Sequence, residues 1–413
     1  MDPPKSASRN TLKITALAYV PAVVAMMTIG VLVPFIDRLC SDLSASRAEV
    51  GFAIALFSMP SAVLATVGGG LIDSYGLRRS MCLAACASAT GSLLASRSHS
   101  LLALDGAMLV AGLGFGALCV GLPCLIMATL RDGARIRAMS FASTFAPTGY
   151  AAGLLLAVPF TTGGAWRLAL LTHAAIMVAM LIALVVGMPA ITSAEKTAHG
   201  LGRRLGEVFS LFREPRALRL GLAVALPNAL SYGTSLAAPS YLARVHHLSL
   251  ATSSASVAVA KLTAMIIGGL SMGYLLSRAV APRLLFAAMA VIGLMAQALL
   301  FLPARGIALA TVALVVWLFA FGGMAGGAMT LLPTVTRDPN RSGAASGLVN
   351  QFISLASFAA PSTWLALHDG GQYVLLAAAC LAVSSVALPG AVLAAPARPG
   401  VAAPEAAPPK ALR

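Results

Sequence analysis

Twelve long apolar segments occupy nearly the whole chain, and they limit its fold more than any other feature. Crossing the hydrocarbon core of a bilayer as a helix takes about 20 apolar residues. Of the 413 residues, 59% are hydrophobic and only 10% are charged, which is unlike a soluble domain. The sequence therefore predicts an all-α integral membrane protein with spans at 14–36, 50–71, 77–96, 101–129, 138–160, 165–188, 217–241, 252–276, 283–303, 307–332, 344–366 and 373–394.

The positive charges between these spans are unequally divided. With both termini placed inside, the inner segments hold 21 of the 28 Lys and Arg residues. The outer loops hold only six, which are Arg38, Arg47, Arg97, Arg167, Arg244 and Arg305. Because inner loops of membrane proteins are enriched in Lys and Arg, we expect a multi-pass protein of the cell inner membrane with a cytoplasmic N-terminus and C-terminus.

Composition also argues against several classes of protein. The net charge of +15 follows the membrane side and does not gather on one domain, so we expect no nucleic-acid partner. The six cysteines lack metal-ligand spacing, which predicts no metal site. There is no phosphate-binding loop and no spacing typical of a catalytic group, so we expect neither an enzyme nor a cofactor.

Two motifs recur at about half the chain length, which predicts an internal duplication. At an offset of 206, Arg131, Asp132, Arg135, Ala138 and Ser140 recur as Arg337, Asp338, Arg341, Ala344 and Ser346. At an offset of 204, Gly69, Leu71 and Arg79 recur as Gly273, Leu275 and Arg283. We predict a cytoplasmic tail (1–13), a first six-helix half (14–189), a cytoplasmic linker (190–216), a second six-helix half (217–394) and a disordered tail (395–413).

The stretch "GGGLIDSYGLRRS" (68–80) places charge and glycine between the second and third spans. It resembles the signature Gly-x-Leu-x-Asp-Arg-x-Gly-Arg-Arg/Lys of the major facilitator superfamily, with Ser74 and Leu77 in place of two arginines. Further matches occur in the family's order, among them "GLGFG" (112–116), "GAWR" (164–167) and "GAASGLVN" (343–350). The resemblance covers nearly the whole chain and implies two pseudo-symmetric six-helix halves.

The resemblance also implies a conformational latch on the inner side of the membrane. In the family, the acid of this signature holds the two halves together in one conformation. The corresponding residues here are Gly69, Asp73, Gly76, Arg78, Arg79 and Arg137, with Gly273, Arg278 and Arg283 as the second-half counterpart. The alternative is that Asp73, Arg78 and Arg79 are ordinary solvated loop charges.

Lys261 is the most informative charged residue within a span. It lies about nine residues below the outer end of the eighth span, which is roughly 13 Å at 1.5 Å per residue. A charge at that depth is costly unless it faces water or a partner. We interpret Lys261 as a group that binds an anionic substrate or takes part in coupling, and a structural pair with a polar neighbour is the alternative.

The other polar residues in the spans have weaker signals. Asp105 is a candidate proton carrier that could equally be solvated at its helix start, and Met108 stands where proton-coupled relatives have an arginine. His173 is expected to be a hydrogen-bonded core histidine. The remaining candidates line the cavity or hold helices together: Asn228, Tyr232, Asn350 and Gln351.

Small residues and proline mark two spans that could bend or pack closely. In the fifth span, Pro147 removes a backbone hydrogen bond, and Gly149 and Gly153 permit bending or tight packing. In the tenth span, "GGMAGG" (322–327) predicts a seam of small residues.

Together these features predict a secondary transporter that moves a small organic solute by alternating access. Lys261 favours an anionic or strongly polar substrate. A drug/proton antiporter that exports apolar or cationic compounds is the second hypothesis, and a non-transporting sensor is a remote third. Protons as a coupling ion stay open. We expect the bilayer and a small-molecule substrate as partners, and a monomeric protein.

Overall fold

A computed structural model describes residues 5–64, 72, 75–130, 138, 141–142, 144–188, 215–278, 280–302, 306–335, 342–369 and 374–382. These residues are nearly all helical, and no strand occurs among them. Each of the twelve predicted spans is helical over most of its described part. Six helices in the described part of the chain are long and apolar enough to cross a membrane: Leu12–Asp42, Arg47–Leu64, Leu101–Thr129, Trp166–Gly187, Leu250–Leu276 and Ile307–Gly327.

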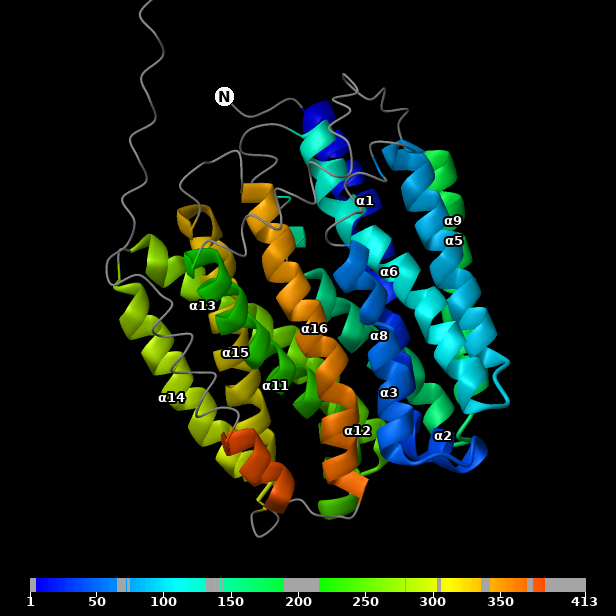
Figure 1. Cartoon of the computed structure of the whole chain (residues 1–413), viewed down its shortest axis with the longest axis vertical. Helices are drawn as coiled ribbons and strands as arrows, with labels where there is room; N and C mark the ends of the chain where they lie inside the picture. The colour runs from blue at the N-terminus through cyan, green and yellow to red at the C-terminus, as the bar shows by residue number, and fades with distance from the viewer. Residues whose placement is uncertain are drawn as a thin grey trace, which may run out of the picture.

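The first half of the chain forms one side of the bundle (Figure 1). Its elements are α1 (Lys5–Leu32), the 3-10 turn η1 (Val33–Phe35), α2 (Ile36–Asp42), α3 (Arg47–Leu56), α5 (Leu77–Ser96), α6 (Leu101–Thr129), α8 (Phe145–Thr161) and α9 (Trp166–Gly187). Residues 59–64 are also helical.

The second half forms the other side, drawn from green to orange in Figure 1. It contains α11 (Pro215–Val245), α12 (Leu250–Ala260), the π-helical segment η2 (Lys261–Met265), α13 (Ile266–Ser277), α14 (Pro282–Leu300), α15 (Ile307–Val335) and α16 (Ser342–Asp369). Residues 374–382 form a further helical stretch. We call the end of the bundle with residues 37–47, 161–166 and 246–249 the distal end, because it lies opposite the start of α1 (Figure 1).

Three spans depart from a continuous α-helix. The first changes to 3-10 geometry at Val33, where Pro34 lies in the first turn and has no N–H to donate. The fifth restarts at Phe145, with a turn at Thr144, so Pro147 lies in the first turn of α8, where a missing N–H costs little. The eighth changes to π-helical geometry at Lys261.

Serine side chains cap the starts of three helices toward the distal end, α3, α6 and α12. Ser46 forms a capping box with Glu49 at the start of α3. Ser100 and Ser249 accept hydrogen bonds from Ala103 N–H and Thr252 N–H at the starts of α6 and α12. These caps satisfy backbone groups that would otherwise lack a partner in a helix.

A common apolar core joins the two halves. The largest buried cluster contains Phe35 and Phe57 from the first half and Leu236 and Tyr241 from the second. Gly51 of α3 also lies against Pro361 of α16, because a Cβ at Gly51 would be 2.9 Å from the Pro361 carbonyl oxygen. The halves are therefore packed together toward the distal end.

Glycines allow α1 and α8 to cross closely. A Cβ placed at Gly149 would lie 2.4 Å from the Val23 carbonyl oxygen, and one at Gly153 would lie 2.3 Å from the Met27 carbonyl oxygen. Backbone atoms cannot yield to such contacts as a flexible side chain can. Gly149 and Gly153 thus serve tight packing, one of the two roles expected of them.

We expect Gly153→Ala to lower the apparent melting temperature, because α1 and α8 must move apart to admit the methyl group. The cost should be about 1–3 kcal/mol, as for other overpacked cores. Thermal unfolding of the detergent-purified protein measures it. Gly106→Ala is the matched control, since a Cβ at Gly106 of α6 meets nothing within 4 Å. Equal melting temperatures for both variants would contradict the close crossing.

Candidate functional site at the interface of the two halves

Lys261 is buried where the two halves meet. It is the first residue of the π-helical segment η2, and only 6% of its surface is exposed. Its ammonium Nζ donates a hydrogen bond to Ser235 Oγ of α11 at 2.8 Å. Its Nζ also lies 4.1 Å from the centre of the Tyr150 ring. Within the described residues, no carboxylate is paired with Lys261. The polar contacts of its ammonium group are the Ser235 hydroxyl and the face of the Tyr150 ring.

A seam of small residues holds η2 and α13 against α15. A Cβ at Gly322 would lie 2.0 Å from the Met265 carbonyl oxygen, and one at Gly326 would lie 2.9 Å from the Gly269 Cα. This close packing confirms the predicted seam in the tenth span. It also fixes the backbone of the π-helical segment that carries Lys261, and such segments are frequent at functional sites.

Tyr150 approaches Lys261 from the other half. It lies on α8, is fully buried, and donates a hydrogen bond from its hydroxyl to the Ser235 carbonyl oxygen at 2.7 Å. Ser235 Oγ in turn donates to the Ser231 carbonyl oxygen at 2.6 Å. Ser235 is therefore the meeting point of Tyr150 from the first half and Lys261 from the second.

Polar side chains follow one face of α11 at helical spacing. Asn228 Nδ2 donates to Ser357 Oγ of α16 at 2.8 Å, which corresponds to the helix-joining alternative for Asn228. Tyr232 is buried, and its hydroxyl lies beside the Ser58 side chain of the first half without a hydrogen bond of normal geometry. The stripe that begins at Asn228 thus reaches the interface through Tyr232 and Ser235.

An ion pair joins the halves at the distal end. Asp37 of α2 accepts a hydrogen bond from Arg47 of α3, and its Oδ2 lies 2.7 Å from Arg244 Nη2 at the end of α11. Arg47 is buried, whereas the Asp37 side chain is 48% exposed. The sequence analysis does not single out this cluster, because Asp37 follows the expected end of the first span at residue 36. The sequence signal that could have indicated this ion pair is the opposite charge of Asp37 and Arg244, which follow the ends of the first and seventh spans.

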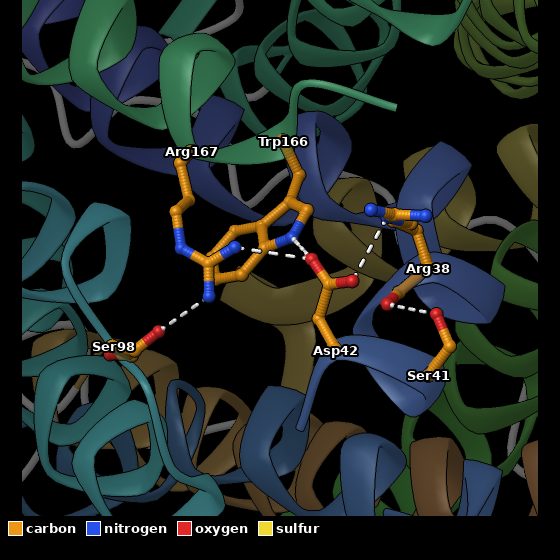
Figure 2. A network of polar contacts seen from close by, with 6 residues as sticks. All are labelled: Arg38, Ser41, Asp42, Ser98, Trp166 and Arg167. Carbon is orange, nitrogen blue, oxygen red and sulfur yellow. Dashed lines mark hydrogen bonds and ion pairs between the residues drawn. The ribbon is translucent and has the colours of Figure 1, made fainter. Parts of the chain in front are cut away.

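A second distal network ties the first half together (Figure 2). Asp42 lies between Arg38 Nε at 3.0 Å, Trp166 Nε1 at 2.9 Å and Arg167 Nη1 at 3.1 Å. Arg167 also donates to the Ser98 carbonyl oxygen at 3.0 Å. The "GAWR" motif therefore supplies two of the donors to Asp42. All these contacts lie within one half, so the network is structural.

The predicted latch lies only partly within the described residues. Gly69, Asp73 and Arg137 fall outside them, so the latch stays a prediction. Gly76 is the N-cap residue of α5 and has φ +84°, a conformation that favours glycine. Arg78 donates to the Val185 carbonyl oxygen of α9, and Arg79 is exposed.

The second-half counterpart of the latch lies on or next to α13. A Cβ at Gly273 would meet nothing within 4 Å. The Arg278 guanidinium is exposed and lies 5.2 Å from the centre of the Tyr274 ring. Arg283 is also exposed, in the first turn of α14.

The remaining predicted site residues make no contact with Lys261 among the described residues. Asp105 is half-buried near the distal start of α6, and its Oδ1 is buried without a hydrogen-bond partner among the described residues. Gln351 is half-buried on α16, and the side chain of Asn350 lies outside the described residues. His173 is confirmed as a core histidine, with ring nitrogens 2.8 Å from Ser92 Oγ and 2.6 Å from the Val24 carbonyl oxygen.

Within the described residues, no group of three or more His, Cys, Asp or Glu side chains could hold a metal ion. The arrangement instead joins two helical halves through a buried cation, tyrosines and hydroxyls.

Comparison with known proteins identifies the family. The family model of the Major Facilitator Superfamily matches residues 18–361, so this chain belongs to that family of membrane transporters. No curated protein sequence matches the chain.

Solved transporter structures share its fold. A variant of the nucleoside transporter NupG superposes with a TM-score of 0.76 at 12% identity, over 93% of this chain and 99% of that one. A bacterial homologue of the human lysosomal transporter Spinster superposes in two inward-facing structures. The occupied form has a TM-score of 0.71 at 14% identity, over 95% of this chain and 97% of that one. The unoccupied form has a TM-score of 0.74 at 13% identity, over 93% and 96%.

We expect Asp42→Asn to lower the apparent melting temperature, with a cost of about 1–2 kcal/mol, because charge-assisted hydrogen bonds to Arg38 and Arg167 are weakened. Thermal unfolding of Asp42→Asn, Arg167→Met and the double variant forms a double-mutant cycle. The two effects should be less than additive, because each variant breaks the same contact. Strictly additive losses would show that Asp42 and Arg167 are not coupled.

Proposed function

We propose that this protein is a secondary active transporter that moves a small organic solute by alternating access, and that the solute carries an anionic or strongly polar group. The observation that carries this proposal is Lys261, a buried cation at the junction of two halves that has no carboxylate partner among the described residues. The family and the fold support a transporter, and Lys261 supports the choice of substrate.

The physical reason is the cost of a buried charge. An ammonium taken out of water without an ionic partner is costly, because a hydroxyl and an aromatic face replace only part of its hydration. A bound anion would restore the missing charge partner. Lysine, as a compact cation on a flexible stem, suits a ligand that enters and leaves.

The distribution of positive charge supports an orientation. We place the distal end, with Asp37 and Arg244, on the outer side and both termini in the cytoplasm, because the segments predicted to be inner hold 21 of the 28 Lys and Arg residues. The protein would then act in the cell inner membrane, as a monomer. Protons as a coupling ion stay a proposal, with Asp105 as its candidate carrier.

We expect small carboxylates to raise the melting temperature of the purified wild-type protein and to have little effect on Lys261→Met, because a ligand stabilises the folded state that binds it. Thermal unfolding with carboxylates, neutral polar metabolites and lipophilic cations measures this. Lys13→Met is the matched control, since it removes a lysine that is exposed near the start of α1. Stabilisation of all three proteins by lipophilic cations alone would overturn the proposal and support drug export.

We also expect Asp73→Asn to slow transport while leaving the melting temperature nearly unchanged, because the predicted latch acts between two conformations and not on folding. Uptake or efflux of the compound found by the thermal screen, in vesicles containing each variant, gives the rate. Glu49→Gln is the control, because Glu49 caps α3 at the distal end and takes no part in the latch. An unchanged rate for Asp73→Asn would contradict the latch.

A further inference from the structure

Ser235 and Tyr150 occupy the space around the Lys261 ammonium group in this structure. An ammonium group has three hydrogen-bond donors, and the hydrogen bond to Ser235 Oγ uses one of them. The Tyr150 ring covers the ammonium at 4.1 Å from the ring centre. An aromatic face attracts a cation through its quadrupole, so the ring partly replaces an anion there.

Tyr150 and Lys261 belong to different halves of the transporter. Tyr150 is on α8, whereas Lys261 and Ser235 are on η2 and α11. Tyr150 makes two contacts across the interface, one with the Lys261 ammonium and one from its hydroxyl to the Ser235 carbonyl oxygen. Separation of the halves at this level breaks both contacts at once.

The position of Tyr150 is fixed by the backbone of its own half. A Cβ at Gly30 of α1 would lie only 2.2 Å from the Tyr150 carbonyl oxygen. The neighbouring Gly149 is packed equally closely against α1. The ring therefore moves with α1 and α8 as a unit, and it leaves Lys261 only when those helices move away from α11 and η2.

The charge of the site limits what could replace the ring. Among the described residues, the buried cations are Lys261 and Arg47, and Arg47 is paired with Asp37. A single ammonium matches one negative charge, whereas an arginine fork or a second cation would suit a phosphate dianion better. The site thus fits a compact organic monoanion.

We propose that Tyr150 is a gating and specificity-determining residue, whose ring occupies the place of a compact organic monoanion on Lys261 while the distal end is closed. When the halves separate at the distal end, the ring withdraws and the monoanion takes its place. The chemical class of this ligand rests on the proposed function, whereas the gating by Tyr150 rests on the contacts across the interface.

Labelling of a cysteine below Tyr150 tests this gate without a known substrate. Ser231→Cys is suitable because Ser231 is buried on α11, one turn below Ser235 when seen from the distal end. The reagents are an anionic sulfonate-bearing and a cationic ammonium-bearing methanethiosulfonate. Each is applied to intact cells and to inside-out membrane vesicles, and the parent protein with Ser231 gives the background from its six native cysteines.

We expect Tyr150→Leu to accelerate labelling of Ser231→Cys by the anionic reagent on the order of tenfold, from one side of the membrane only. The loss of a buried cation–π contact and a hydrogen bond shifts the population toward the distal-open state. Tyr150→Phe keeps the ring and loses only the hydrogen bond, so it should accelerate labelling about threefold. If Tyr150→Leu does not fold, Tyr150→Phe still tests the gate by the same labelling measurement.

Lys261→Met should remove the preference for the anionic over the cationic reagent. Unchanged labelling by both Tyr150 variants, or acceleration from both sides alike, would overturn the gate, because the second result indicates general loosening. The thermal screen separates the two proposals. If Tyr150→Leu accelerates labelling from one side while carboxylates fail to stabilise the wild type, the gate stands and the proposed substrate class is wrong.

Discussion

The hydrocarbon core of a bilayer offers no water to a polypeptide backbone, and this constraint determines the architecture of the protein. Every N–H and C=O group within a span must find its partner inside the chain, which leaves helices as the solution for a single apolar segment. Departures from regular α-helical geometry within the spans are local. They fall at Pro34, at the start of α8 near Pro147, and at the π-helical segment that begins at Lys261.

Once all spans are helices, their packing decides how the halves meet. Glycines at the α1–α8 crossing allow backbone contact and thereby fix Tyr150. The seam between α13 and α15 does the same for the segment that carries Lys261. Each half is thus rigid around its own contribution, and Ser235 is where the two contributions meet. The exposed Asp37–Arg244 pair adds little energy by comparison, since exposed ion pairs contribute roughly 0–1 kcal/mol.

Much of the fold was predictable because hydrophobicity is a local property. The predicted third and fourth spans, 77–96 and 101–129, coincide with α5 and α6. The depth of Lys261 was also predictable, since it depends only on position along one span. Asp37 carries no such signal, because the expected first span ends at 36 while helix α2 continues to Asp42. A charge at a span end looks like a loop charge until its partner is known.

The sequence by itself determined the helical membrane architecture, the resemblance to a transporter family and the presence of one lysine deep in a span. These depend on composition, periodicity and short motifs. Only the tertiary structure decided what surrounds that lysine. The Tyr150 ring reaches Lys261 from a helix of the other half, and Ser235 reaches it from the preceding helix α11. Asn228 turns toward α16. Such contacts follow from close packing between helices and between halves, and no local pattern encodes them.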